Sequence, residues 1–139
     1  MLDIENDVFD TVAESLRSTF PGIYVAGEYV NSPPSLPAVT IVEADSMVAK
    51  NMSTEYVEDY ARVLYEVNVY SNKSVGKKSE AKSIFAAVDE ALRKLNFTRT
   101  SKTQVPNYAD ATIYRLNGRY EAIVGHGNIP NTYWIYQNT

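Results

Sequence analysis

The sequence contains no cysteine and only one histidine, and these two shortages exclude several kinds of chemistry. Without cysteine the chain has no disulfide framework, no thiol nucleophile and no thiolate metal site. The one histidine, His126, lies between two glycines in a predicted loop, so a single chain cannot build the usual His/Cys metal site. A Ser-His-Asp triad would need the same residue, and no serine lies in a Gly-x-Ser-x-Gly elbow. We therefore expect no catalytic residue, no metal site and no enzymatic activity.

A phosphate-binding loop is missing as well. The turn Val75-Gly-Lys-Lys-Ser79 precedes a predicted helix, as such a loop does. The motif requires glycine where this chain has Ser71, and serine or threonine where it has Lys78. We therefore expect no nucleotide cofactor, and no other cofactor motif is present.

Long apolar runs are also absent, since no apolar segment approaches the roughly 18 to 20 residues that span a bilayer. The first five residues are acidic where a signal peptide would be basic, so neither export nor membrane association is expected. The net charge of −4 argues against nonspecific binding to a nucleic-acid backbone. With 139 residues, of which 45% are hydrophobic, the chain predicts one domain over 1–139 with a real core.

The charges are divided unevenly along the chain. Residues 1–60 carry 11 acidic and 2 basic side chains, whereas residues 61–139 carry 6 acidic and 11 basic ones. One interpretation is attraction between the acidic part of one copy and the basic part of the next, as in a ring. The other is that these charges only solvate exposed faces.

Hydrophobic periodicity predicts two amphipathic helices, over 3–20 and 77–95. Short β-rich or alternating segments predict strands over 23–30, 38–44, 56–70, 97–105, 112–124 and 133–136. Residues 45–56 read as a long exposed connection. The pair Asn117-Gly118 favours a hairpin, but a hairpin would mix apolar and polar faces, so we predict one continuous strand with a bend or bulge at Gly118.

The resulting order is α-β-β-β-α-β-β-β. Two helices packed on one face of a mainly antiparallel sheet would bury both apolar stripes, so the predicted class is α+β.

Several residues are candidates for contact with a partner or a second copy. Met47, Val48 and Met52 are apolar residues in a polar connection, and methionine suits adaptable contact surfaces. The aromatic strand that contains Trp134 and Tyr136 pairs either with the chain's own sheet or with a neighbour's edge. The remaining candidates are basic residues, at a turn (Lys73, Lys77, Lys78) and on the polar face of strand 112–124 (Arg115, Arg119).

Six ordered motifs span most of the chain, from about residue 20 to residue 125. They are Phe20-Pro-Gly-Ile-Tyr-Val-x-Gly-Glu-Tyr, Ser32-Pro-Pro-x-x-Pro-Ala-Val, Tyr65-Glu-Val-Asn-Val-Tyr-Ser-Asn-Lys, Lys77-Lys-Ser-Glu-Ala-Lys, Thr112-Ile-Tyr-Arg and Arg119-Tyr-Glu-Ala-Ile-Val. This pattern resembles the tail-terminator and tail-completion proteins, often labelled minor capsid proteins, of long-tailed phages and prophages of Gram-positive bacteria.

The resemblance implies an α/β subunit of a hexameric ring that caps the tail tube and presents a surface to the head. It implies self-association, contact with the tail tube protein and a neck protein, and a location at the head–tail junction of the virion after assembly in the host cytoplasm. Two alternatives stay open: a neck or head-completion protein, and a small ligand-binding domain or enzyme with a deep polar pocket.

Overall fold

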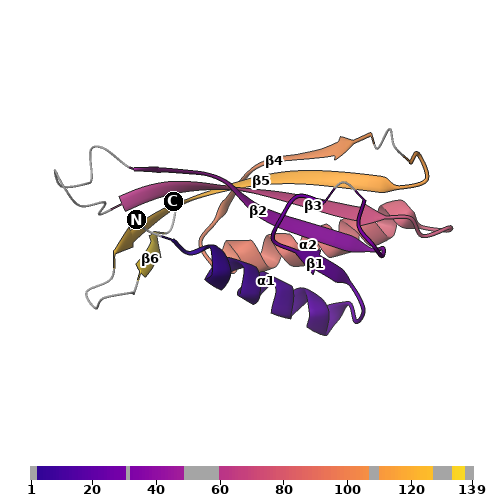
Figure 1. Ribbon diagram of the computed structural model, residues 1–139, viewed down its shortest axis with the longest axis horizontal. Coiled ribbons are helices and arrows are strands. Elements are labelled where there is room, and N and C mark those ends of the chain that lie inside the picture. The colour runs from indigo at the N-terminus through magenta and orange to yellow at the C-terminus, as the bar shows by residue number, and fades with distance from the viewer. Residues whose placement is uncertain (1–2, 31, 49–59, 107–109, 127–132, 137–139) are drawn as a thin grey trace.

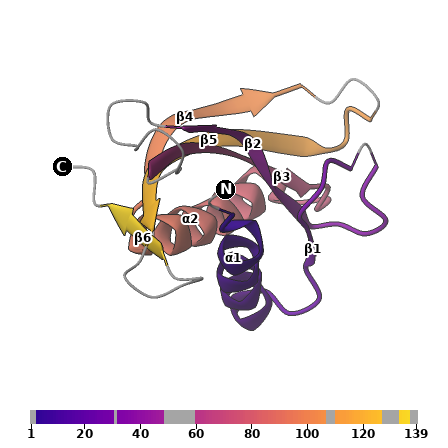
Figure 2. The same ribbon diagram turned by 60° about the vertical axis from the view of Figure 1, so that its left-hand side comes forward.

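The computed structural model describes residues 3–30, 32–48, 60–106, 110–126 and 133–136. Its elements follow the order α1 (Glu5–Thr19), β1 (Tyr24–Ala26), β2 (Ala38–Val48), β3 (Tyr60–Ser71), α2 (Lys77–Lys94), β4 (Thr98–Val105), β5 (Tyr114–His126) and β6 (Tyr133–Tyr136). Both helices lie on one side of a twisted sheet (Figures 1 and 2). The predicted α+β class and the predicted order of elements are confirmed.

Each helix begins and ends where the sequence offers a signal. At the start of α1 an Asp3 carboxylate oxygen accepts a hydrogen bond from the Glu5 amide at 3.1 Å, and the helix ends before Gly22, whose φ is +83°. At the end of α2, Asn96 has a φ of +67°, and the Phe97 amide turns back to donate to the Leu92 carbonyl at 3.0 Å. A left-handed residue after the last turn is the usual helix stop.

The sheet runs in the order β1-β2-β3-β5-β4, with β6 paired to β5 beyond the end of β4. Only β1 and β2 are parallel; every other pair is antiparallel. The helix-facing side of the central strands is dry, as the alternation of 56–70 predicts for its described part. Large buried side chains such as Tyr65, Tyr120 and Phe85 fill the space between sheet and helices.

The predicted long connection over 45–56 is wrong at its start. Residues 45–48 belong to β2, which continues to Val48 after a register shift between Glu43 and Asp45. All the side chains from Ala44 to Val48 are exposed, so the segment shows no alternation, and its extended backbone is fixed by pairing with β3. The rest of that prediction, together with the start of the predicted strand at 56, lies outside the described residues.

The prediction of one continuous strand at Asn117-Gly118 is confirmed, but the predicted bend or bulge is not. The register between β3 and β5 is unbroken through Gly118, and the nearby shift lies in β4, between Arg99 and Ser101. The reason for glycine is space: a Cβ at position 118 would lie 2.5 Å from the tip of the buried Phe85 ring. Gly118 therefore lets α2 pack closely on β5.

Candidate functional site

The face of the sheet that points away from the helices is called here the open face. Paired residues of neighbouring strands share a face, so the register assigns every strand residue to one side. The structure divides the ten contact residues that the sequence predicts into three groups: apolar residues, three lysines and two arginines. Met52 lies outside the described residues.

The apolar group lies at one end of the open face. Met47 of β2, Ile123 of β5 and Tyr136 of β6 fall on one row across the sheet, and Trp134 lies on the adjoining row. Trp134 is 54% exposed, and Met47 and Tyr136 are each 42% exposed. We call these four residues, together with Tyr60, the apolar patch; on the same row the Arg62 side chain lies between Met47 and Ile123 and pairs with Glu121 at 3.5 Å.

Two aromatic rings contact each other at a tilt of 49° within the patch. The rings of Tyr60 and Tyr136 lie 5.5 Å apart between centroids, with their hydroxyls 3.4 Å apart. Both rings pack against Gly125, where an added Cβ would lie 2.9 Å from each. The absence of a side chain at Gly125 leaves room for both rings over the β5 backbone.

Strand β6, which carries two of the five patch residues, pairs with β5 of its own chain. The Asn96 side chain donates a hydrogen bond to the Ile135 carbonyl at 2.9 Å and so ties β6 to the turn after α2. Within this single chain, strand 133–136 therefore pairs with the chain's own sheet, which is one of the two predicted alternatives.

Val48, which the sequence groups with Met47, lies on the other side. Its pairing partner Ala61 is buried on the helix face, yet Val48 itself is 50% exposed. Met47 and Val48 therefore lie on opposite faces of the sheet, because successive strand residues face opposite sides.

The three lysines lie at the far end of the sheet, around the turn from β3 to α2. Lys73 and Lys78 are exposed, and the Lys77 ammonium donates to the Thr112 carbonyl at 3.2 Å. Ser71 anchors the turn by donating to a Glu80 carboxylate oxygen at 2.8 Å. The molecule thus carries an apolar patch at one end of its sheet and a basic turn at the other.

Arg115 and Arg119 differ in their surroundings. Arg119 is exposed, whereas Arg115 is half-buried and donates twice to the Asn68 side-chain oxygen, at 3.0 and 2.8 Å. Its guanidinium also lies 5.5 Å from the centroid of the Tyr70 ring. Within the single chain Arg115 is therefore held by hydrogen bonds on the open face, whereas Arg119 is not buried.

A polar network surrounds Arg115 and was missed from the sequence. The Asn117 amide donates to Glu66 at 2.9 Å and to Asn68 at 3.0 Å, and both asparagines are buried. The Tyr29 hydroxyl lies 3.4 Å from the second Glu66 oxygen, so the segment between β1 and β2 reaches over this half of the face. The sequence did contain a signal for this network, because asparagine is normally depleted in the middle of strands.

Three carboxylates form a second unpredicted cluster on the helix side. Single oxygens of Asp3, Glu5 and Glu43 lie within 4.8 Å of one another. Burial, followed by the charges of Glu5, Asp3 and Asp45, raises the pKa of Glu43 to about 7. One buried oxygen of Glu43 has no hydrogen-bond partner among the described residues, and neither does the buried hydroxyl of Tyr65, the strand neighbour of Glu43.

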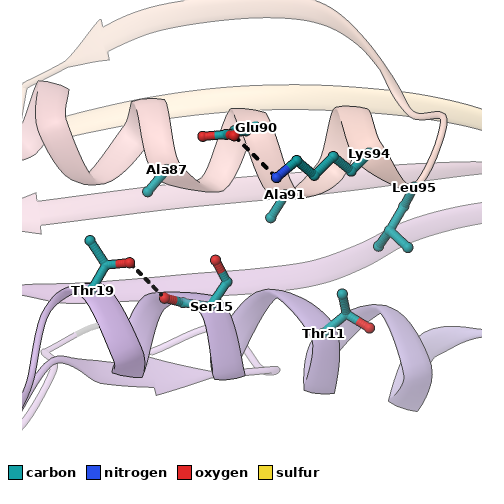
Figure 3. A pocket seen from close by; sticks show the side chains of 8 residues that line it. All are labelled: Thr11, Ser15, Thr19, Ala87, Glu90, Ala91, Lys94 and Leu95. Atoms are coloured by element: carbon teal, nitrogen blue, oxygen red, sulfur yellow. Dashed lines mark hydrogen bonds and ion pairs between the residues drawn. The ribbon is translucent and has the colours of Figure 1, made fainter.

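Two hollows lie on the surface of the described residues. A 270 Å³ groove runs between α1 and α2, where Thr11, Ser15 and Thr19 face Ala87 and Ala91, with the Glu90–Lys94 ion pair at its rim (Figure 3). A 440 Å³ hollow lies between α1, β1 and β2, next to Glu5 and Glu28. The buried oxygens without partners, on Thr40, Glu43 and Tyr65, line neither hollow.

No chemistry comparable with a catalytic centre converges in the described part of the chain. His126 is exposed at the end of β5, where it pairs with Tyr133. The described acid cluster contains only carboxylates. Over the same residues, no helix is both long and apolar enough to cross a membrane.

Comparison with known proteins adds no relative. No family model matches the chain, and a search of curated proteins finds no significant similarity.

Proposed function

We propose that this protein is a structural subunit of a phage particle, a tail terminator that assembles into a ring, caps the tail tube and presents a surface to the head. The ring is expected to be hexameric, and the protein to reside at the head–tail junction of the virion. The proposal includes no catalysis and no cofactor.

The observation that carries the proposal is the apolar patch. Exposed aromatic and sulfur-containing side chains gathered on one end of a sheet face are typical of a surface that another protein covers. Trp134, Tyr136 and Met47 belong to the residue types that dominate such contacts. Solvation of separate surface residues does not account for a cluster drawn from β2, β3, β5 and β6.

The contrast between the two ends of the sheet supports a joining role. One end offers the apolar patch, and the other offers Lys73 and Lys78 beside Val75, which is 81% exposed. Two chemically different ends suit a subunit that meets two different assemblies, since each end can select its own partner.

The test combines light scattering with electron microscopy. The mass of the purified protein is measured alone and after mixing with tail tubes of the same phage, and the tubes are then imaged for density at their ends. A ring, or binding confined to one end of the tube, is the expected result. A monomer that ignores tubes but binds the portal-side assembly would replace the proposal with the neck protein.

A matched pair of variants ties the result to the patch. The double variant Met47→Ser, Trp134→Ser removes two exposed apolar side chains from the patch, whereas Val75→Ser removes one from the opposite end. We expect the double variant to lose tube capping by at least about tenfold, the usual effect of removing interface anchors. Equal capping by the double variant and the wild type would contradict the role of the patch.

A further inference from the structure

Strand β2 leaves most of one edge open. Its β1 side is paired only from Ala38 to Thr40, because β1 is three residues long. From Ile41 to Val48, eight residues, no other described strand pairs with that side. Backbone donors and acceptors along an open strand edge are a template for pairing with another chain.

Strand β4 has no described strand on its outer side and leaves the opposite edge of the sheet open in the described part of the chain. It is the last strand in the order and also has eight residues, Thr98–Val105, most of them exposed (Figure 2). It carries Arg99 and Lys102 and no acidic residue. Hence the sheet ends on two open edges of similar length.

The charges around these edges are opposite in sign. The described residues up to Val48, which form α1, β1 and β2, carry eight carboxylates and one arginine. Residues 72–106, which form α2 and β4, carry eight basic and three acidic side chains. On the edge strands themselves, β2 carries Glu43 and Asp45, and β4 carries Lys102 and Arg99, of which Arg99 pairs with Asp89 of its own chain at 3.0 Å.

We infer that β4 of one copy pairs with the open edge of β2 in the next copy, so that one sheet continues from subunit to subunit around the ring. The inference rests on the proposed function, because it names the surfaces that would close that ring. A contact between two different patches is the kind that rotation closes into a ring.

The direction of the pairing follows from the sheet. Strands β2, β3, β5 and β4 alternate in direction, so β4 runs opposite to β2. A ring axis roughly along the strands keeps every copy in the same direction and keeps its helices on the same side. The junction is therefore antiparallel, and open-face residues of β2 meet open-face residues of β4.

The acid cluster makes the β2 edge electrostatically favourable for a basic strand. Glu43, midway along the open stretch, lies close to Asp3 and Glu5 without a described basic partner. Positive charge brought by a neighbouring β4 offsets this repulsion, and it does so more strongly at low salt.

Because the chain has no cysteine, engineered disulfides report the junction directly. On the open face lie Asp45 of β2 and Thr98 and Ser101 of β4, with Asp45 and Thr98 on the same row through β3 and β5, whereas Lys102 and Gln104 lie on the helix face. Within one chain β3 and β5 separate β2 from β4 by roughly 14 Å, from about 4.8 Å per strand. A disulfide needs Cα atoms within about 7 Å, so any bond between these positions joins two copies.

The experiment compares double-cysteine variants of the full chain under mild oxidation, alone and on tail tubes. Asp45→Cys with Thr98→Cys, or with Ser101→Cys, should give a ladder of covalent oligomers on a non-reducing gel. Asp45→Cys with Lys102→Cys, or with Gln104→Cys, places the thiols on opposite faces and is the matched control. We expect at least a tenfold excess of ladder for a same-face pair over the controls.

A charge reversal supplies the second readout. Asp45→Lys, on the open β2 edge, should weaken assembly about tenfold. Glu14→Lys, an exposed change on α1 with the same net charge, should leave assembly unchanged.

The outcomes separate the two proposals. If rings cap tubes but the same-face cysteine pairs give no ladder, the inference is overturned and the proposed function stands. The same holds if the same-face pairs and the opposite-face controls give equal ladders. A protein that neither assembles nor binds tubes overturns both.

Discussion

On β5, Leu116, Tyr120 and Val124 point toward the helices and are buried among apolar side chains. From the same strand, Asn117 and Ile123 point to the open face, where one joins a polar network and the other an exposed apolar patch. The helix face is held by packing, whereas the open face combines hydrogen bonds in its middle with unburied apolar area at its end. One sheet can thus bury one face to stabilise the fold and keep apolar area on the other face for binding.

The sharpest test of the helix face is Gly118→Ala. The added Cβ would lie 2.5 Å from the ring of Phe85, which is itself buried and cannot swing into solvent. We expect the free energy of unfolding to fall by about 2 to 3 kcal/mol, as overpacking of a core does. Urea unfolding measures it.

The control for this prediction is the pair Gly118→Ala, Phe85→Leu. A smaller side chain at position 85 makes room for the new methyl group, so the double variant should be more stable than the sum of the single changes predicts. Strict additivity would mean that contact with Phe85 is not the reason for glycine.

The middle of the open face is tested by Asn68→Ala. This change removes the oxygen that accepts from both Arg115 and Asn117, and it leaves those donors buried without it. We expect a loss of about 2 kcal/mol in urea unfolding. Arg119→Ala, on the neighbouring strand β5 but exposed, should change stability by less than about 0.5 kcal/mol. Similar losses for both variants would show that the network contributes nothing of its own.

The two faces also differ in how much of them the sequence predicts. Apolar periodicity predicts α1, α2 and the buried face of β3, because buried side chains recur with the period of the helix or strand that carries them. The same reasoning misses residues 45–48 of β2, where every side chain is exposed and only pairing with β3 makes a strand. An alternation of apolar and polar residues cannot reveal a strand segment whose side chains are all exposed.

The candidate site is predicted in part for the same reason. Met47, Trp134 and Tyr136 stand out as apolar residues in polar or terminal segments, and the structure gathers them on one surface. The polar network stays hidden, because Asn68 and Asn117 become neighbours only through the register of β3 and β5. The tail-terminator function itself stays a prediction.

Two buried tyrosines allow a comparison within the helix face. The Tyr120 hydroxyl donates to Asp89 at 2.7 Å, whereas the Tyr65 hydroxyl has no partner among the described residues. Tyr120→Phe should therefore cost about 1 to 1.5 kcal/mol, and Tyr65→Phe should be neutral or slightly stabilising. Urea midpoints at neutral pH measure both. A large loss on Tyr65→Phe would reveal a partner for its hydroxyl.

The acid cluster predicts a dependence on pH. Since the fold raises the pKa of Glu43 from 4.5 to about 7, it favours the protonated carboxyl. The stability contributed by this group is full below about pH 4.5 and is lost as the pH rises through 7. Allowing for solvent screening, we expect Glu43→Gln to exceed the wild type by about 1 kcal/mol at alkaline pH and to lose this advantage in acid. A difference that does not vary with pH would rule out this titration.

The smallest effect on folding is expected at the apolar patch. Trp134 is 54% exposed, so Trp134→Ser removes little buried area and should change the free energy of unfolding by less than about 0.5 kcal/mol. Thermal and urea unfolding of Trp134→Ser beside Val75→Ser measure this, with Val75 as the exposed apolar residue outside the patch. If Trp134→Ser unfolds early, the residue serves the fold, and a capping defect would no longer identify a contact surface. If it keeps wild-type stability and loses tube capping, the exposed aromatic area acts in binding, and the separation between the two faces holds where they differ most.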